Sequence, residues 1–309
     1  MYLLKRMSLN RTIVAATSLL QEIYVITENS DTVDVYYCHR PYQRKGSVTI
    51  PGMNPTDIAT SYADVCVYLL DSNNACLRRI HRNLKTTECP LDVSPGESLK
   101  SMSITERGVI VVVKSGNKVM MYDPMNGKTE HVVLEGVSKE GKSVVHATEI
   151  GKNRLLACHD TQTFVYDLES TEVCSCIGPG GSHIALKNSK CAIIADESKQ
   201  LVWMLDIEKW QITDERGGME NPRYVHYGME NGLMLVAWLN YLDVYSFEEI
   251  DIKSHLAATE TEAPQAIASE AAVLQSDVLQ GKSDALMETT GIPNSHFWRQ
   301  GYKSKFVIL

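Results

Sequence analysis

Short apolar runs separated by turn residues recur along the first 250 residues of the chain. A typical unit has an almost wholly apolar run, such as residues 109–113, and then a second run that ends in an aromatic residue or Asp, such as residues 119–123. Short runs rich in Val, Ile and Tyr are typical of β-strands. No long helical periodicity interrupts them between residues 10 and 250, so the pattern predicts an all-β fold.

A short strand of small and apolar residues opens each unit, and its first residue gives the period. The six starting residues are Thr12, Asp57, Ser101, His146, His183 and Tyr224. A period of about 40–45 residues with several short strands per unit is typical of β-propellers. We expect six four-stranded antiparallel blades in a closed ring, because a single blade cannot bury both of its apolar faces.

Ring closure and turn chemistry follow from the same pattern. Residues 2–7 are expected to pair as a strand with the last blade. Asp recurs in register at strand ends, where it caps turns by accepting hydrogen bonds from nearby backbone N–H groups. We therefore interpret the following residues as structural and not as catalytic carboxylates: Asp71, Asp123, Asp167, Asp196 and Asp206.

The character of the chain changes near residue 255. We expect the propeller to span residues 1–255, and residues 256–309 to form an acidic linker and a mostly disordered tail. Residues 257–264 are small, polar and acidic, a composition typical of linkers. Within the tail, residues 267–280 could form a short amphipathic helix, since Ile267, Ala271, Leu274 and Val278 recur at helical spacing.

Residues 67–80, which read VYLLDSNNACLRRI, resemble a repeat of the NHL-type six-bladed propellers. Residues 195–202 are a weaker copy, with Lys199 where the family has Asn. The resemblance implies a propeller over residues 10–250 that most often binds protein, and in some members with basic faces binds RNA. Members of the tripartite-motif type carry a RING and a B-box before the propeller. No Cys/His ligand series precedes residue 38 here, so the resemblance implies a ubiquitin-pathway role only through a partner chain.

Charge and cysteine usage narrow the possible partners. The net charge is −8 and the one basic run is residues 78–82, so nucleic acid is an unfavourable partner. Eight cysteines lie mostly in apolar runs without a C-x2-C pair, which argues against a structural zinc site. Cys174 and Cys176 are expected on one face of a strand, in the core. No signal-peptide pattern and no membrane-spanning apolar run is found. We expect a cytoplasmic protein.

The opening strand of each propeller blade lies innermost, so the six starting residues should ring one rim of the central channel. With Arg223, the candidate binding residues are Thr12, Asp57, Ser101, His146, His183, Arg223 and Tyr224. His146 and His183 lie on adjacent units, and with Asp57 they could hold a metal or a small anion. A hydrated channel mouth lined by polar groups is the simpler interpretation, so no metal or cofactor is predicted.

A second candidate for a protein-binding surface consists of residues 222–227 together with Trp238. Exposed Tyr, Trp and Arg are common anchors of protein interfaces. Aromatic residues on strands more often pack in the core, and we favour that interpretation for Tyr227 and Trp238.

The functional prediction is a non-catalytic scaffold that binds an unidentified protein partner through a propeller rim. No G-x-S-x-G, H-E-x-x-H or phosphate-binding loop occurs in the sequence. Two alternatives remain: an RNA-binding NHL module, and a calcium-dependent enzyme similar to the lactonases or strictosidine synthases. The second is disfavoured because Asp57 is the only carboxylate among the six starting residues.

Overall fold

A computed structural model describes residues 1–94, 97–134, 143–151, 153–159 and 161–247. The chain divides into two compact units, Met1–Ile250 and Asp251–Leu309. The second unit, with the predicted linker, tail and helix at 267–280, lies outside the described residues. The expected domain limit at residue 255 therefore remains a prediction.

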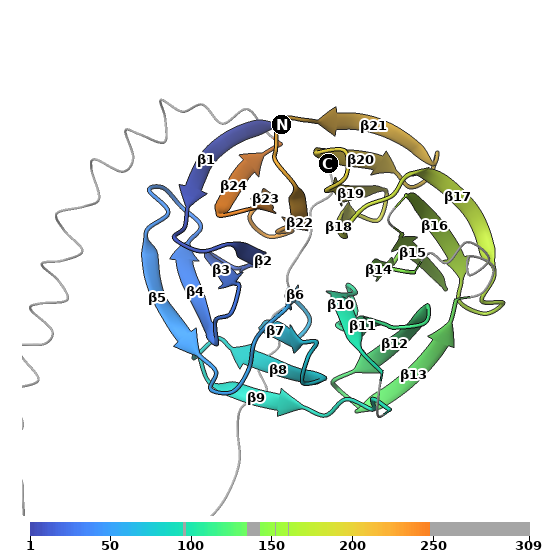
Figure 1. The fold of residues 1–309 in the computed structure, drawn as a ribbon, viewed down its shortest axis with the longest axis horizontal. Helices are drawn as coiled ribbons and strands as arrows, with labels where there is room; N and C mark the ends of the chain where they lie inside the picture. The colour runs from blue at the N-terminus through green and yellow to red at the C-terminus, as the bar shows by residue number, and fades with distance from the viewer. Residues whose placement is uncertain (95–96, 135–142, 152, 160, 248–309) are drawn as a thin grey trace, which may run out of the picture. The chain divides into compact units, whose positions relative to one another are not determined.

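The first unit is a six-bladed β-propeller, as predicted (Figure 1). Each blade is a four-stranded antiparallel sheet whose strands follow one another outward from the channel. Blade 1 contains β2 (Ile13–Leu19), β3 (Glu22–Thr27), β4 (Thr32–Tyr37) and β5 (Arg44–Thr49). Blade 2 contains β6 (Asp57–Ser61), β7 (Cys66–Asp71), β8 (Cys76–His81) and β9 (Thr86–Cys89). Blade 3 contains β10 (Leu99–Ile104), β11 (Ile110–Lys114), β12 (Lys118–Asp123) and β13 (Lys128–Val133). Blade 4 contains β14 (His146–Glu149), β15 (Arg154–Cys158), β16 (Gln162–Asp167) and β17 (Val173–Pro179). Blade 5 contains β18 (His183–Asn188), β19 (Cys191–Asp196), β20 (Leu201–Asp206) and β21 (Gln211–Arg216).

The sixth blade combines the two ends of the ring. It contains β22 (Pro222–Tyr227), β23 (Leu233–Trp238) and β24 (Tyr241–Ser246), and β1 (Tyr2–Ser8) supplies its outer strand. Arg6 donates two hydrogen bonds to the Asp243 carboxylate, at 2.8 and 2.9 Å. The prediction that residues 2–7 close the ring is confirmed.

The outer strand is the least buried in each blade. In blade 2 every residue of β7 is buried, because the second strand packs against the neighbouring blades on both faces, whereas two of the four residues of the outer strand β9 are exposed. Every residue of β21 in blade 5 is exposed. Cys174 and Cys176 lie on the outer strand β17 and are exposed. Their predicted place in the core is therefore wrong.

The recurrent Asp residues cap turns, as predicted. Asp71 Oδ1 accepts hydrogen bonds from the backbone N–H groups of Asn73 and Asn74, both at 3.1 Å. Asp206 binds the corresponding N–H groups of Glu208 and Lys209 in blade 5. Trp238 is buried in the apolar cluster between blades 5 and 6, as favoured above. No helix in the described part of the chain is long and apolar enough to cross a membrane.

Candidate functional site

The innermost strand of each blade has one edge without a strand partner, and this edge faces the channel. Backbone groups on such an edge need other partners when they are buried. Side chains from neighbouring blades supply them. The Asp57 carboxylate of blade 2 accepts a hydrogen bond from Met102 N–H of blade 3 at 2.6 Å, and one from Ile58 N–H at 2.7 Å. Ser101 Oγ of blade 3 donates to the Val145 carbonyl at the start of blade 4, at 2.7 Å.

His146 and Tyr224 continue this layer around the channel. His146 Nδ1 accepts a hydrogen bond from Ile184 N–H at 3.3 Å, so its proton lies on Nε2, which faces the Met102 carbonyl at 3.2 Å. The Tyr224 hydroxyl donates to the Ile58 carbonyl, which links blade 6 to blade 2. The His146 bonds thus join blade 4 to both of its neighbours, and the Tyr224 bond joins two blades that are not neighbours in the ring.

The aromatic rings of this layer pack against one another across three consecutive blades, with interplanar angles of 45° and 37°. The ring centroids of His146 and His183 lie 3.8 Å apart, and those of His183 and Tyr224 lie 3.9 Å apart. His183 is 7 % exposed, yet neither of its ring nitrogens makes a hydrogen bond of ordinary geometry among the described residues; its polar neighbour is the Val225 backbone. Buried polar side chains are normally hydrogen-bonded, so His183 is the unusual member of the layer.

Burial controls the charge of these groups. It raises the pKa of Asp57 to about 7, against the opposing effect of its two backbone N–H bonds. It lowers the pKa of His146 to about 4. The pKa of His183 is well below its ordinary value because of burial, and then because of the neighbouring His146 and His226 rings. At neutral pH both imidazoles are uncharged, whereas Asp57 lies near its midpoint.

The ring predicted from the sequence is therefore present as a buried layer and not as an open rim. The buried candidates are Asp57, Ser101, His146, His183 and Tyr224. Thr12 is half-buried, and its carbonyl accepts a hydrogen bond from Glu28 N–H at 2.9 Å. Arg223 alone is exposed, and it forms ion pairs with Glu197 at 3.0 Å and Glu28 at 3.6 Å. That any of these seven residues binds a partner remains a prediction.

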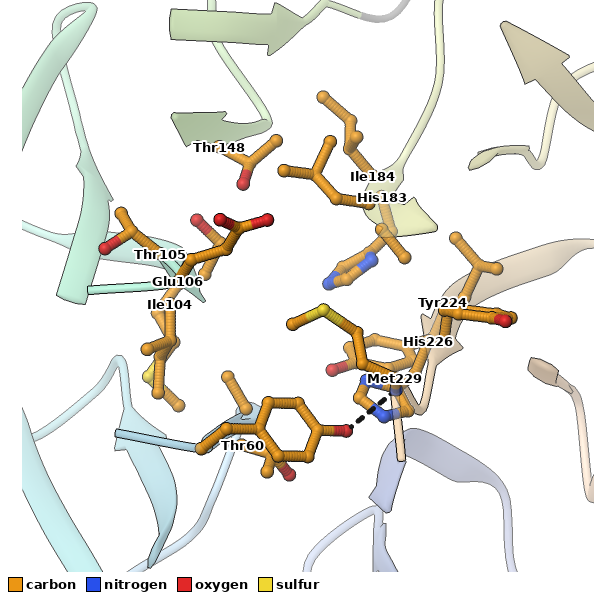
Figure 2. Close-up of a pocket in the computed structure, with 18 of the residues that line it drawn as sticks. Thr60, Ile104, Thr105, Glu106, Thr148, His183, Ile184, Tyr224, His226 and Met229 are labelled. Carbon is orange, nitrogen blue, oxygen red and sulfur yellow. Dashed lines mark hydrogen bonds between the residues drawn. The ribbon is translucent and has the colours of Figure 1, made fainter. Parts of the chain in front are cut away.

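A cavity of about 80 Å³ lies on one side of this layer. His183 and Tyr224 contribute to its wall, together with residues from the ends of the inner strands, and the His183 ring points toward the centre of the opening (Figure 2). Nearby, Thr17 is within 2.7 Å of the Thr60 hydroxyl and 3.2 Å of His226 Nδ1. We did not predict Thr17 and Thr60; their signal was a polar residue inside an otherwise apolar inner strand.

The cavity opens toward one face of the propeller. Because antiparallel strands alternate in direction, the turns after the first and third strands of every blade lie on the same face. We call this the cavity face; its turns include residues 62–65, 82–85, 124–127 and 228–232. A wider groove of about 690 Å³ lies on it, lined in part by Leu20, Tyr37, Arg82 and Glu230.

Exposed apolar side chains gather on the cavity face. Four lie in its turns, namely Met125, Met229, Val65 and Leu84, with exposures of 76, 45, 38 and 37 %. Tyr37, also 37 % exposed, is the last residue of β4 before the next such turn. Among the described residues, the turns of the opposite face hold no large exposed hydrophobic side chain, and Val133, 50 % exposed at the end of β13, is the one such residue that borders them. The described turns of the two faces thus differ in chemistry.

Comparisons with known proteins agree with the fold and leave the function open. No protein-family model matches the chain, and no curated protein matches it. The NHL resemblance is therefore not confirmed. Among solved structures, the WD40 β-propeller domain of Doa1 is similar, with a TM-score of 0.59 and 13 % sequence identity over 80 % of this chain and 97 % of that one. A likeness at this identity shows that the chain has a β-propeller fold.

Proposed function

We propose that this propeller is a non-catalytic module that binds a protein partner on its cavity face. The observation that carries the proposal is the gathering of Met125, Met229, Val65, Leu84 and Tyr37 on that face. Single exposed apolar residues are ordinary, but several on one face that also carries a groove are typical of interaction surfaces. Met and Tyr are also enriched at protein interfaces, where Met adapts to irregular shapes.

The groove adds polar complementarity to this surface. Arg82 and Glu230 line it together with the Tyr37 ring. An aromatic wall with one charge of each sign suits a partner segment that has an apolar anchor and a polar flank. A mixed-charge lining gives less support to an RNA partner, because RNA binding needs clustered positive charge.

The buried layer supports a non-catalytic role. A calcium-dependent hydrolase would need six to eight oxygen ligands around its ion, and among the described residues of the layer Asp57 offers the single carboxylate. A cytoplasmic location and a divergent NHL-type ancestry remain part of the proposal.

The proposal is tested by changing the cavity face alone. The tagged full chain is used to capture proteins from extract, and each captured protein is measured by quantitative mass spectrometry. We expect the double variant Leu84→Glu/Met229→Glu to capture at least ten-fold less of the proteins that the wild-type chain enriches. Each new carboxylate would have to be desolvated in the interface. Both positions are exposed turn residues, so circular dichroism and the thermal midpoint should not change.

Arg223→Ala serves as the control, because Arg223 is exposed at the start of β22, away from the cavity-face turns. The control should retain the enriched proteins. Retention by the double variant, with loss in Arg223→Ala, would place the partner on the opposite face and contradict the proposal.

A further inference from the structure

Three side chains of metal-ligand type meet on the channel axis from different blades. Asp57 comes from blade 2, His146 from blade 4 and His183 from blade 5, and one ligand atom of each lies within 4.8 Å of the others. All three are buried. The geometry points to a binding site for one first-row divalent cation, with Zn²⁺ as the best fit, held by the Asp57 carboxylate and the two imidazoles. Two nitrogen donors and one oxygen donor, with a water as fourth ligand, are typical of zinc sites that keep an open position.

His183 is the strongest single observation for the site. Both of its nitrogens are buried and make no hydrogen bond of ordinary geometry among the described residues, although the Val225 backbone lies close enough to raise its pKa. Leaving such a group unpaired is costly, and a bound cation would take the lone pair of one nitrogen. The ring packs between His146 and Tyr224, and turning it toward a cation would give up at most a weak contact with the Val225 backbone.

His146 is already oriented as a metal ligand usually is. Ligating histidines commonly donate their other N–H to a backbone carbonyl, which fixes the tautomer. The Nε2–H of His146 faces the Met102 carbonyl in this way, which leaves Nδ1 unprotonated on the side of blade 5. The contact that coordination would replace is the 3.3 Å bond from Ile184 N–H, the longest bond of this layer.

The remaining requirements are space and ligand distance. Ligand atoms around a tetrahedral zinc are about 3.3 Å apart, from bonds of about 2.0–2.1 Å, so the cluster must contract from its present spread. The cavity of about 80 Å³ extends from the cavity face, at Glu106 and Met229, to His183. A water occupies about 30 Å³, so the cavity can hold the bound water beside His183, the one of the three ligands that lines it.

The test is a zinc titration of the full chain by calorimetry at pH 7.5. The background carries Cys174→Ser and Cys176→Ser, because these exposed thiols could bind zinc themselves. We expect one Zn²⁺ per chain and a higher thermal midpoint with zinc than with chelator. His183→Phe keeps the ring stack but removes both nitrogens, and it should weaken binding at least 100-fold and abolish the midpoint shift.

His131→Phe is the matched control, since His131 lies on the outer strand β13 with its side chain 44 % exposed. It should bind zinc as the background does. Should His183→Phe fail to fold by circular dichroism, His183→Gln gives the same comparison. Absence of one-to-one binding, or equal affinity in the His183 and His131 variants, would overturn the proposal.

Discussion

At the residue scale, Asp57 shows how one side chain serves two blades. It begins the inner strand of blade 2, yet one carboxylate oxygen is bound by an N–H group of blade 3. The two backbone bonds hold the carboxylate in the channel layer while burial opposes its charge. The polar character of this position was predictable from the repeat. Its burial was not, because the partner N–H lies 45 residues away in the sequence.

Asp57 gives a pH-dependent prediction. Its pKa rises from 3.8 to about 7 on folding, so between these values the folded state binds more protons than the unfolded state. The wild type should therefore lose stability as pH rises through this window. In Asp57→Asn this contribution is absent. The stability of the variant relative to wild type should rise by about 3 kcal/mol between pH 4.5 and 7.

Urea unfolding with chelator present, at several pH values, measures both proteins. Groups that titrate equally in the two proteins contribute equally to both free energies of unfolding, so their contributions cancel when one is subtracted from the other. Parallel stability profiles for wild type and Asp57→Asn across this window would show that the carboxylate is not penalised by its surroundings.

At the element scale, the sequence predicted which segments form strands but not whether a strand lies in the inner or the outer part of its blade. The apolar second strands and the Asp-capped turns follow from local patterns, and β7 and Asp71 confirm both. Cys174 and Cys176 were misplaced because the runs of inner and outer strands are both short, and exposure depends on which blade layer a strand occupies. The contacts of the His183 ring with His146 and Tyr224 could not be predicted from local sequence, because three blades contribute to them and only the closed propeller brings these blades together.

The closed ring depends on β1, which supplies the outer strand of blade 6. Arg6 holds the fully buried Asp243 carboxylate, and its guanidinium lies 4.7 Å from the centre of the Trp238 ring. We expect Arg6→Ala to lower the free energy of unfolding by about 2 kcal/mol, because a buried carboxylate loses its charged partner; Arg6 is partly exposed, which lowers the cost.

Lys5→Ala is the neighbouring control, as Lys5 is exposed on the same strand. It should change stability by less than about 0.5 kcal/mol. Equal urea midpoints for the two variants would mean that the Arg6–Asp243 pair does not stabilise the closing strand.

At the scale of the whole molecule, the propeller has two unlike faces. The buried layer of Asp57, His146, His183 and Tyr224 links blades across the channel, and the exposed apolar residues lie on the cavity face. The sequence predicted six blades but located the binding rim at the start of the inner strands. The proposed binding surface instead uses the turns at the other end of those strands, where the groove and most of the exposed apolar turn residues share one face.

Amide hydrogen exchange of the full chain, alone and with a partner recovered by the capture experiment, tests the binding face most directly. The account predicts slower exchange in residues 82–85 and 228–232, which border the groove. Protection confined to residues 28–31 and 197–200, around the Glu28 and Glu197 ion pairs of Arg223, would contradict it.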